Sequence, residues 1–274
     1  KRALSLAVAS VMLLGMMVVG SGASYVDVSS DDNLEAIEVM QAVGVMTGDD
    51  QGNFNPDQQV TRGEMAVVMC QLLKLTPGGT HPFTDVPDWA NGYVAAMYAN
   101  GITGGTSATT YGTDEPVTAV QGALMVMKAL GYFGYQGEFG SSWELATIKK
   151  ANEIGLYDGI SATVYAPLTR NEVAQLALNA LESDVMIVNE VGGVDVSAGD
   201  GTNVNVRPTY TYTEVQSKKA DDYRTVSADQ DAIQQLCEKL YGKDLKKATG
   251  GNDNMGRPAT EWTYDGKSIG KYAE

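Results

Sequence analysis

A short glycine-bounded element occurs three times in this chain and constrains its fold more than any other feature. Residues 44–48 read Gly-Val-Met-Thr-Gly, and related sequences stand at 101–105 and 155–159. Each copy is followed by a loop that ends in Pro and then Thr, and the third loop is three residues shorter than the first two. Recurrence of this kind is the signature of a repeat architecture.

Each repeat has the pattern of two helices, one on either side of its glycine-rich loop. After the first loop, Met65, Val68, Met69 and Leu72 follow a helical spacing. The glycine that opens the loop is the expected stop of the preceding helix. One helix pair cannot bury its apolar face alone, so the three units should pack together. We therefore expect a mainly α fold of three helix–loop–helix repeats, followed by a small α+β module that the chain contains only in part.

The second helix of each repeat begins with Thr and has Glu or Gln three residues later. Such a pair can form a capping box, in which each side chain accepts a hydrogen bond from the backbone amide of the other residue. The pairs are Thr61/Glu64, Thr118/Gln121 and Thr169/Glu172.

Two of these helix starts also hold an arginine, at Arg62 and Arg170. A cation in the first turn faces the positive end of the helix dipole, which costs roughly 0.3–1 kcal/mol when exposed. A residue that opposes local stability twice, at the same point of a motif, indicates a binding role. The natural ligand for an arginine beside free helix-start amides is an anion. The alternative is a surface arginine whose stem packs on the helix.

Three motifs resemble those of the S-layer homology repeat: Phe-Thr-Asp-Val at 83–86, Phe-Asn-Pro at 54–56 and Thr-Arg-Gly-Glu at 61–64. The resemblance runs from about Tyr25 to Leu181. It implies a pseudo-threefold helical prism with grooves between neighbouring repeats. It also implies non-covalent binding of an anionic cell-wall polysaccharide, often one that ends in a pyruvylated amino sugar. In that family the motif Arg, with nearby Asp, Trp and glycine-loop residues, holds the acidic sugar.

Carried onto this chain, the resemblance implies a ligand-binding set made of Arg62, Arg170, Thr61, Thr169, Asp27, Asp85, Trp89, Trp143 and Gly104. The second repeat has Ala119 in place of the arginine, and the first has Asp32 in place of the tryptophan. The third repeat has no counterpart of the aspartate. At most two grooves should therefore be competent.

Several members of this set have a structural alternative. Trp89 and Trp143 either stack on a sugar face or pack into the repeat core. Asp27 and Asp85 either bind sugar hydroxyls or cap nearby amides, as Asp before a turn often does.

The start of the chain predicts a secretory signal peptide over residues 1–23. Lys1-Arg2 precede an apolar run, and small residues stand before a cleavage point after Ala23. The alternative is a membrane anchor, because the run is about the minimum length for a span. No other segment is apolar enough to cross a bilayer, so we expect no stable membrane span after cleavage. The protein would be secreted to the cell wall or cell surface of a bacterium.

The remaining chain divides into three repeats and a C-terminal α+β region, with boundaries at 24–76, 77–132, 133–184 and 185–274. Within the last region the sequence predicts a helix over 229–241 and a hairpin that turns at Asp265-Gly266. We expect the chain to be a fragment of a longer surface protein.

Charge and composition exclude several functions. With a net charge of −15, the chain as a whole should not attract nucleic acid. Its one histidine, His81, lies in a Pro/Gly-rich linker, so we predict no catalytic residues, no metal site and no cofactor. Residues 49–53 lack the spacing of a calcium loop and read as a polar turn.

The sequence therefore predicts a non-enzymatic protein that anchors to the cell surface by binding an anionic wall polysaccharide, as part of an S-layer or another surface protein. Self-association into an array stays open. The alternative is an exported polysaccharide- or wall-degrading enzyme, anchored by the repeats, with its catalytic module in or beyond 185–274. A tether between outer membrane and peptidoglycan is a third option.

Overall fold

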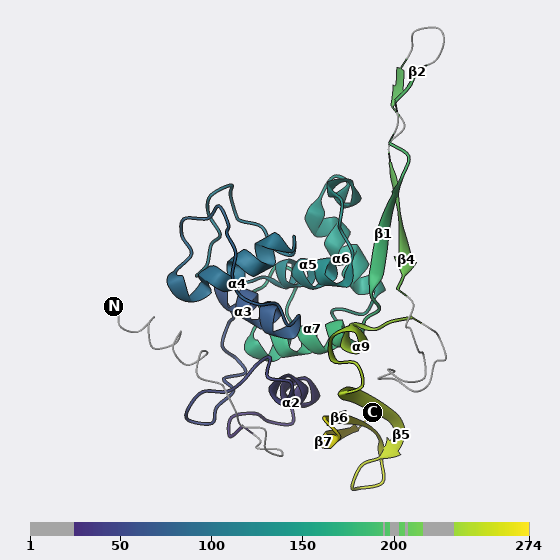
Figure 1. The fold of residues 1–274 in the computed structure, drawn as a ribbon. Helices are drawn as coiled ribbons and strands as arrows, with labels where there is room; N and C mark the ends of the chain where they lie inside the picture. Colours follow the sequence, from purple (N-terminus) through teal and green to yellow (C-terminus); the bar gives the residue numbers. More distant parts are fainter. Residues whose placement is uncertain (1–24, 194, 198–202, 206–207, 216–232, 274) are drawn as a thin grey trace.

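The computed structural model describes residues 25–193, 195–197, 203–205, 208–215 and 233–273, and most of its helices come from the three repeats (Figure 1). The predicted signal peptide lies outside these residues. The helices are α2 (Leu34–Ala42) and α3 (Arg62–Leu72) in the first repeat, α4 (Asp88–Ala99) and α5 (Ala119–Leu130) in the second, and α6 (Trp143–Glu153) and α7 (Arg170–Glu182) in the third. A short 3-10 helix, η1 (Gln136–Phe139), precedes α6.

The first helix of each repeat ends at the glycine that opens the loop, as the sequence predicts. Gly44, Gly101 and Gly155 follow the ends of α2, α4 and α6 with φ of 74°, 68° and 69°. This left-handed conformation is unfavourable for residues with a Cβ, which explains the recurrence of glycine there. Among the described helices, none has both the length and the apolar character needed to cross a bilayer.

The repeats pack on one another in a closed cycle. Helix α4 packs against α3, α6 against α5, and α2 against α7, so the third repeat closes onto the first. At the centre, Val60 N donates to Leu168 O at 3.0 Å, Leu168 N to Val117 O at 2.9 Å, and Val117 N to Val60 O at 2.9 Å. All three residues are buried. Each repeat thus supplies a donor to one neighbour and an acceptor to the other.

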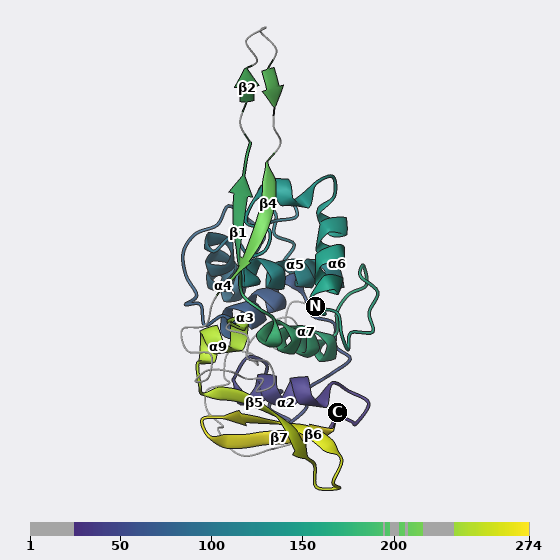
Figure 2. The same ribbon diagram turned by 90° about the vertical axis from the view of Figure 1, so that its right-hand side faces the viewer.

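A β-ribbon follows α7 and projects away from the helices (Figures 1 and 2). Strand β1 (Met186–Val191) pairs antiparallel with β4 (Thr209–Glu214), with Met186 opposite Glu214. Farther out, β2 (Asp195–Ser197) pairs with β3 (Asn203–Asn205).

The C-terminal part forms a three-stranded antiparallel sheet in the order β5 (Leu245–Asn252), β6 (Pro258–Tyr264) and β7 (Lys267–Ala273). The predicted hairpin is confirmed: Asp265 and Gly266 have φ of 49° and 74°, as a type I′ turn requires. The predicted helix is shorter, because α9 spans only Leu236–Tyr241. Gln234 is extended instead, since it bonds Val185 and Val215; residues 229–232 lie outside the described ones.

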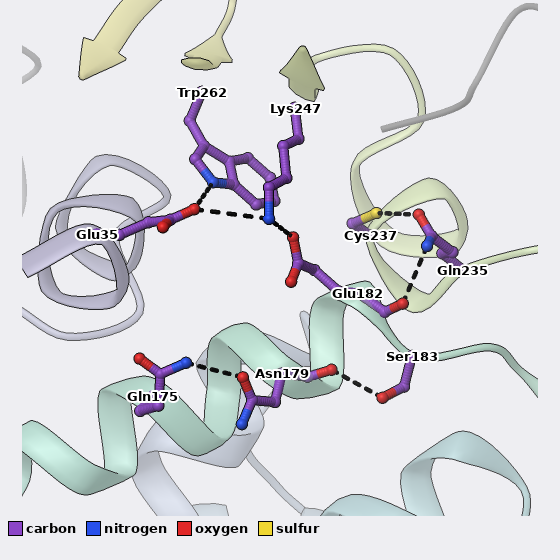
Figure 3. A network of polar contacts seen from close by, with 9 residues as sticks. All are labelled: Glu35, Gln175, Asn179, Glu182, Ser183, Gln235, Cys237, Lys247 and Trp262. Carbon is purple, nitrogen blue, oxygen red and sulfur yellow. Dashed lines mark hydrogen bonds and ion pairs between the residues drawn. The ribbon is translucent and has the colours of Figure 1, made fainter. Parts of the chain in front are cut away.

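This sheet is fixed to the repeats by a polar network around a buried tryptophan (Figure 3). Trp262 Nε1 donates to Glu35 Oε1 on α2 at 2.6 Å. Lys247 on β5 pairs with Glu182 at the end of α7 and lies 3.7 Å from Glu35. Burial raises the pKa of Glu182, against the lowering effect of Lys247. The sheet therefore bridges the first and third repeats.

The expectation of a mainly α fold is wrong, because the described residues form an α+β structure with strands in three antiparallel sheets. The sequence underestimates the strands because several of them bury little apolar surface. Strand β5 reads Leu-Lys-Lys-Ala-Thr-Gly-Gly-Asn and fully buries only Leu245. In the β1–β4 ribbon, burial alternates along each strand, but no residue is fully buried. Such strands carry a weak hydrophobic signal even where their residues alternate.

Candidate ligand-binding site at the repeat interfaces

The predicted capping boxes fix where the second helices begin. In α3, Thr61 Oγ1 accepts from Glu64 N at 3.2 Å, and Glu64 Oε2 accepts from Thr61 N at 2.9 Å. In α7, Thr169 and Glu172 make the same pair of bonds, at 3.3 and 2.9 Å. The Thr side chains are thus occupied by the helix start.

Arg62 does not lie on the surface of α3. Only 5% of the residue is exposed. Its Nε donates to Tyr111 O and its Nη2 to Gly104 O, both at 2.9 Å. The guanidinium carbon also lies 4.8 Å from the centre of the Tyr111 ring. Arg62 therefore reaches from the first repeat into the glycine-rich loop of the second.

Arg170 repeats this arrangement between the third repeat and the first. It is 8% exposed, and its guanidinium carbon lies 4.7 Å from the centre of the Phe54 ring. Nε donates to Phe54 O at 2.7 Å and Nη2 to Thr47 O at 2.9 Å. The reading of these arginines as surface residues with packed stems does not fit, because both guanidinium groups are enclosed.

The charge of the two guanidinium groups is not met by a direct ion pair, because no carboxylate of the described residues lies within ion-pair distance of Arg62 or Arg170. Burial lowers the pKa of Arg170, although the more distant Glu64 and Tyr25 oppose this. A buried cation is costly unless an anion neutralises it. The two guanidinium groups are therefore buried cations with no direct ion pair to a carboxylate in the described part of the chain.

The two aspartates hold the loops that the arginines contact. Asp27 accepts from Phe54 N at 2.7 Å and Asn55 N at 2.6 Å. Asp85 accepts from Tyr111 N and Gly112 N, both at 2.7 Å. Desolvation opposes the ionisation of Asp85, but the amides outweigh it and lower the pKa of the carboxyl. In the structure, both aspartates thus cap loop amides, which is the structural alternative to binding sugar hydroxyls.

The third interface keeps the backbone geometry without an arginine. Ala119 N donates to Ala166 O at 3.0 Å, just as Arg62 N donates to Glu115 O and Arg170 N to Gln58 O, each at 2.8 Å. In the same alignment, Ala162 stands where the other loops have Tyr111 and Phe54. The arginine and its aromatic partner are therefore absent together.

Glu172 has a second role that sequence reasoning missed. Besides its capping bond, Glu172 Oε1 accepts from Ala162 N at 2.8 Å and from Ser161 Oγ at 2.9 Å. Glu172 thus accepts the hydrogen bond from the loop amide that, in the other two loops, is bonded by an aspartate. The available signal was the combination of a shortened third loop with a missing aspartate.

The tryptophans differ in what they contact. Trp89 is half-buried and lies against the start of α3, where a Cβ on Gly63 would approach its ring to 2.9 Å. Trp143 opens α6, which packs on α5, the helix that lacks an arginine. The structure therefore brings Arg62, Thr61, Asp85, Trp89 and Gly104 together, whereas Trp143 lies at the interface without an arginine.

At the remaining interface, Arg170 lies with Asp27 and Thr169, and Asp32 stands in place of the tryptophan. Nearby, Asn33 N donates to Asn171 Oδ1 at 2.8 Å, which joins the start of α2 to the start of α7. Residues 49–53 form the expected polar turn: amide bonds, foremost from Asn53, lower the pKa of Asp49 to about 2.

Comparison with known proteins identifies a family for parts of the first two repeats. The S-layer homology domain model matches residues 24–66 and 82–118. The chain thus contains S-layer homology domains in these two regions, and the third repeat lies outside the match.

Similar proteins include the Surface-layer 125 kDa protein of Lysinibacillus sphaericus, 27% identical over 63% of this chain and 16% of that protein. The Middle cell wall protein of Brevibacillus brevis is 26% identical over 59% and 16%. An Endoglucanase of a Bacillus species is 30% identical over 37% and 12%. The chain therefore spans less than a fifth of the length of these relatives.

Proposed function

We propose that this chain anchors its protein to the cell surface by non-catalytic binding of an anionic wall polysaccharide, as part of an S-layer or a related surface protein. The S-layer homology regions and the surface-protein relatives indicate a secreted, cell-wall-associated protein. A polymer that ends in an acidic, often pyruvylated, sugar would supply the anionic partner for the two arginines.

The observation that carries this proposal is the pair of buried guanidinium groups, neither of which forms an ion pair with another described residue. Each uses one Nε–H and one Nη2–H for loop carbonyls. Arginine has five N–H donors, so donors remain for a ligand carboxylate. The adjacent helix start adds the positive end of the dipole, which also favours an anion.

The two interfaces should bind with different strength. At Arg62, the ring of Trp89 offers an apolar surface for a sugar, and Gly104 and Asp85 hold the loop in place. At Arg170, no tryptophan stands at the matching position. The interface of Ala119 has no arginine at the matching position, so we expect no acidic sugar to bind at that helix start. We therefore expect Arg62 to contribute more binding energy than Arg170.

Sedimentation with purified cell walls tests this proposal. The full chain should sediment with polymer-bearing walls and stay soluble with walls stripped of polymer. Removing one partner of a buried charge pair costs about 2–5 kcal/mol, so Arg62→Met with Arg170→Met should weaken binding about 30-fold or more. Methionine keeps most of the side-chain volume and removes the charge.

Arg257→Met is the matched control, because Arg257 is an exposed arginine in the C-terminal sheet region, paired with Asp253. Circular dichroism and urea unfolding would establish that each variant is folded at the assay temperature. Equal sedimentation of the full chain with both kinds of wall would overturn the proposal. So would unchanged binding by the folded double variant.

A second candidate is an exported glycan-degrading enzyme, favoured by the similarity to the Endoglucanase. That similarity covers 37% of this chain and 12% of the relative, which fits a shared attachment region. Release of reducing ends from soluble β-glucan by the full chain would support an enzyme. We expect no release above a heat-treated sample.

A further inference from the structure

A hollow of about 290 Å³ lies at the third repeat, away from both arginines, where helix α6 faces the base of the β-ribbon. Its lining joins segments far apart in the sequence. Lys149 and Lys150 come from α6, Tyr210 and Tyr212 from β4, and Phe133 and Glu138 from the segment before α6.

The walls of this hollow are closely fitted. A Cβ on Gly137 would lie 1.9 Å from Tyr210 Oη, and one on Gly134 would lie 2.8 Å from Val188 on β1. Any larger residue at these two positions would push the ribbon outward. The glycines therefore let β1 and β4 approach the segment that precedes α6, and this approach shapes the hollow.

Hydrogen bonds fix the orientation of the second tyrosine. The Tyr212 hydroxyl donates to Glu138, whose carboxylate also accepts from Phe133 N at 3.0 Å and Tyr135 N at 2.7 Å. The Tyr212 ring packs 4.8 Å from that of Tyr132. A site held this rigidly loses little entropy when a ligand enters.

The lining combines the Tyr210 and Tyr212 rings with two ammonium groups, those of Lys149 and Lys150, and two carboxylates, those of Glu138 and Glu153. Beside the hollow, the ring of Tyr135 lies 5.7 Å from that of Tyr210, and 39% of Tyr135 is exposed. Lys150 lies 5.3 Å from the centre of the Tyr212 ring and pairs with Glu153 at 2.5 Å. The side chain of Lys149 is 81% exposed and lies 3.9 Å from Glu153. Glu153 therefore holds Lys149 less tightly than Lys150, and the Lys149 ammonium group can turn toward a ligand.

A sugar ring with a carboxylate matches this lining. Its C–H face would lie on the tyrosine rings, its hydroxyls would bond the polar groups of the rim, and its carboxylate would meet Lys149. The volume is at the lower end of small-molecule sites, which suits one ring rather than a long oligosaccharide. A polyanion without an apolar face would leave the tyrosine rings unused.

We infer that this hollow is a second saccharide subsite, which binds one acidic pyranose ring of the wall glycan through Tyr210, Tyr212 and Lys149. The inference rests on the proposed function only in taking the wall polymer as the source of the sugar. It uses none of the residues around Arg62 and Arg170. The β-ribbon would thus extend the wall-binding surface beyond the repeats.

Titration of the ¹⁵N-labelled full chain with methyl β-D-glucuronide, followed by NMR, tests the subsite directly. We expect saturable shifts at the amides of Tyr210, Tyr212 and Lys149, and at least fivefold weaker binding of the neutral methyl β-D-glucoside. Lys149→Ala should weaken glucuronide binding at least threefold. Lys267→Ala, an exposed lysine on β7, is the matched control.

Tyr210→Leu should also weaken binding, and its spectrum would show whether the ribbon keeps its place. No saturable shift at these amides, or equal affinity of the folded Lys149→Ala variant and the control, would overturn the subsite. Such a result leaves the wall-binding proposal intact if the full chain still sediments with walls. Glucuronide binding at the hollow by a chain that fails to sediment would support the subsite and contradict the proposed function.

Discussion

The interface at Arg62 and the interface at Ala119 have the same backbone arrangement but differ in their side chains. At both, a helix-start amide donates to the neighbouring loop, at 2.8 Å in one and 3.0 Å in the other. One interface encloses a guanidinium against Tyr111, and the other has Ala119 and Ala162 in those places. The repeats therefore close without the arginine. This difference teaches that the arginine is not required for the backbone arrangement, which favours a binding role for it.

The largest effect on stability should come from introducing the missing arginine and its aromatic partner at the Ala119 interface. Ala119 is 1% exposed, so Ala119→Arg alone should overpack the interface and lower the free energy of unfolding by about 1–3 kcal/mol. Adding Ala162→Phe supplies the ring, and a cation–π contact is worth about 0.5–1 kcal/mol or more. Urea unfolding should thus show the double variant to be more stable than the single one. Strictly additive effects would argue against the pairing.

A smaller effect should follow from the glycine beside Arg62. A Cβ at Gly63 would lie 2.6 Å from Thr113 Cγ2 and 2.9 Å from the Trp89 ring, whereas Val120 occupies the matching position of the second repeat. Gly63→Ala should gain up to about 1 kcal/mol of helix propensity but lose more to the contact, for a net loss of about 1–2 kcal/mol. Thermal unfolding measures this, and a more stable variant would show that Trp89 moves freely.

The smallest effect concerns the acid stability of the loop that Arg62 contacts. The pKa of Asp85 is lowered in the folded state, so its contribution is present above the unfolded pKa of about 3.9 and is lost as pH falls through the folded pKa. Because Asp85 is exposed, this contribution should stay below about 1 kcal/mol. Between about pH 6 and 2, the free energy of unfolding of the Asp85→Asn variant should fall less steeply than that of the unchanged chain. An identical decline would contradict the assignment.

Much of the helical framework could be predicted from local pattern. The capping boxes at Thr61 and Thr169, the glycine stops and the Asp265-Gly266 turn depend on a few consecutive residues, and all are present. The strands were harder to predict, because β1, β4 and β5 bury little apolar surface and so carry a weak hydrophobic signal. The domain boundaries, including the division at 184/185, stay predictions.

The candidate site could be predicted only in part. The sequence pointed to Arg62 and Arg170 by their unfavourable position in the helix dipole, but not to their burial, because burial depends on loops 42–49 residues later or more than 100 residues earlier. The shortened third loop and the missing aspartate indicated a change near Ala162, but they did not identify Glu172 as the replacement. The bond that Ala162 N donates to Glu172 requires the folded position of a shortened loop.

The sequence by itself determined where the first helix of each repeat ends and where the second begins, because glycine stops and capping boxes act over one turn of chain. It also determined that one of the three interfaces lacks an arginine. Only the tertiary structure decided that the arginines are enclosed without an ion pair to any other described residue, that Asp27 and Asp85 accept from loop amides, and that the β-ribbon forms a hollow with α6. These properties depend on contacts between distant segments, whose energies no local pattern records.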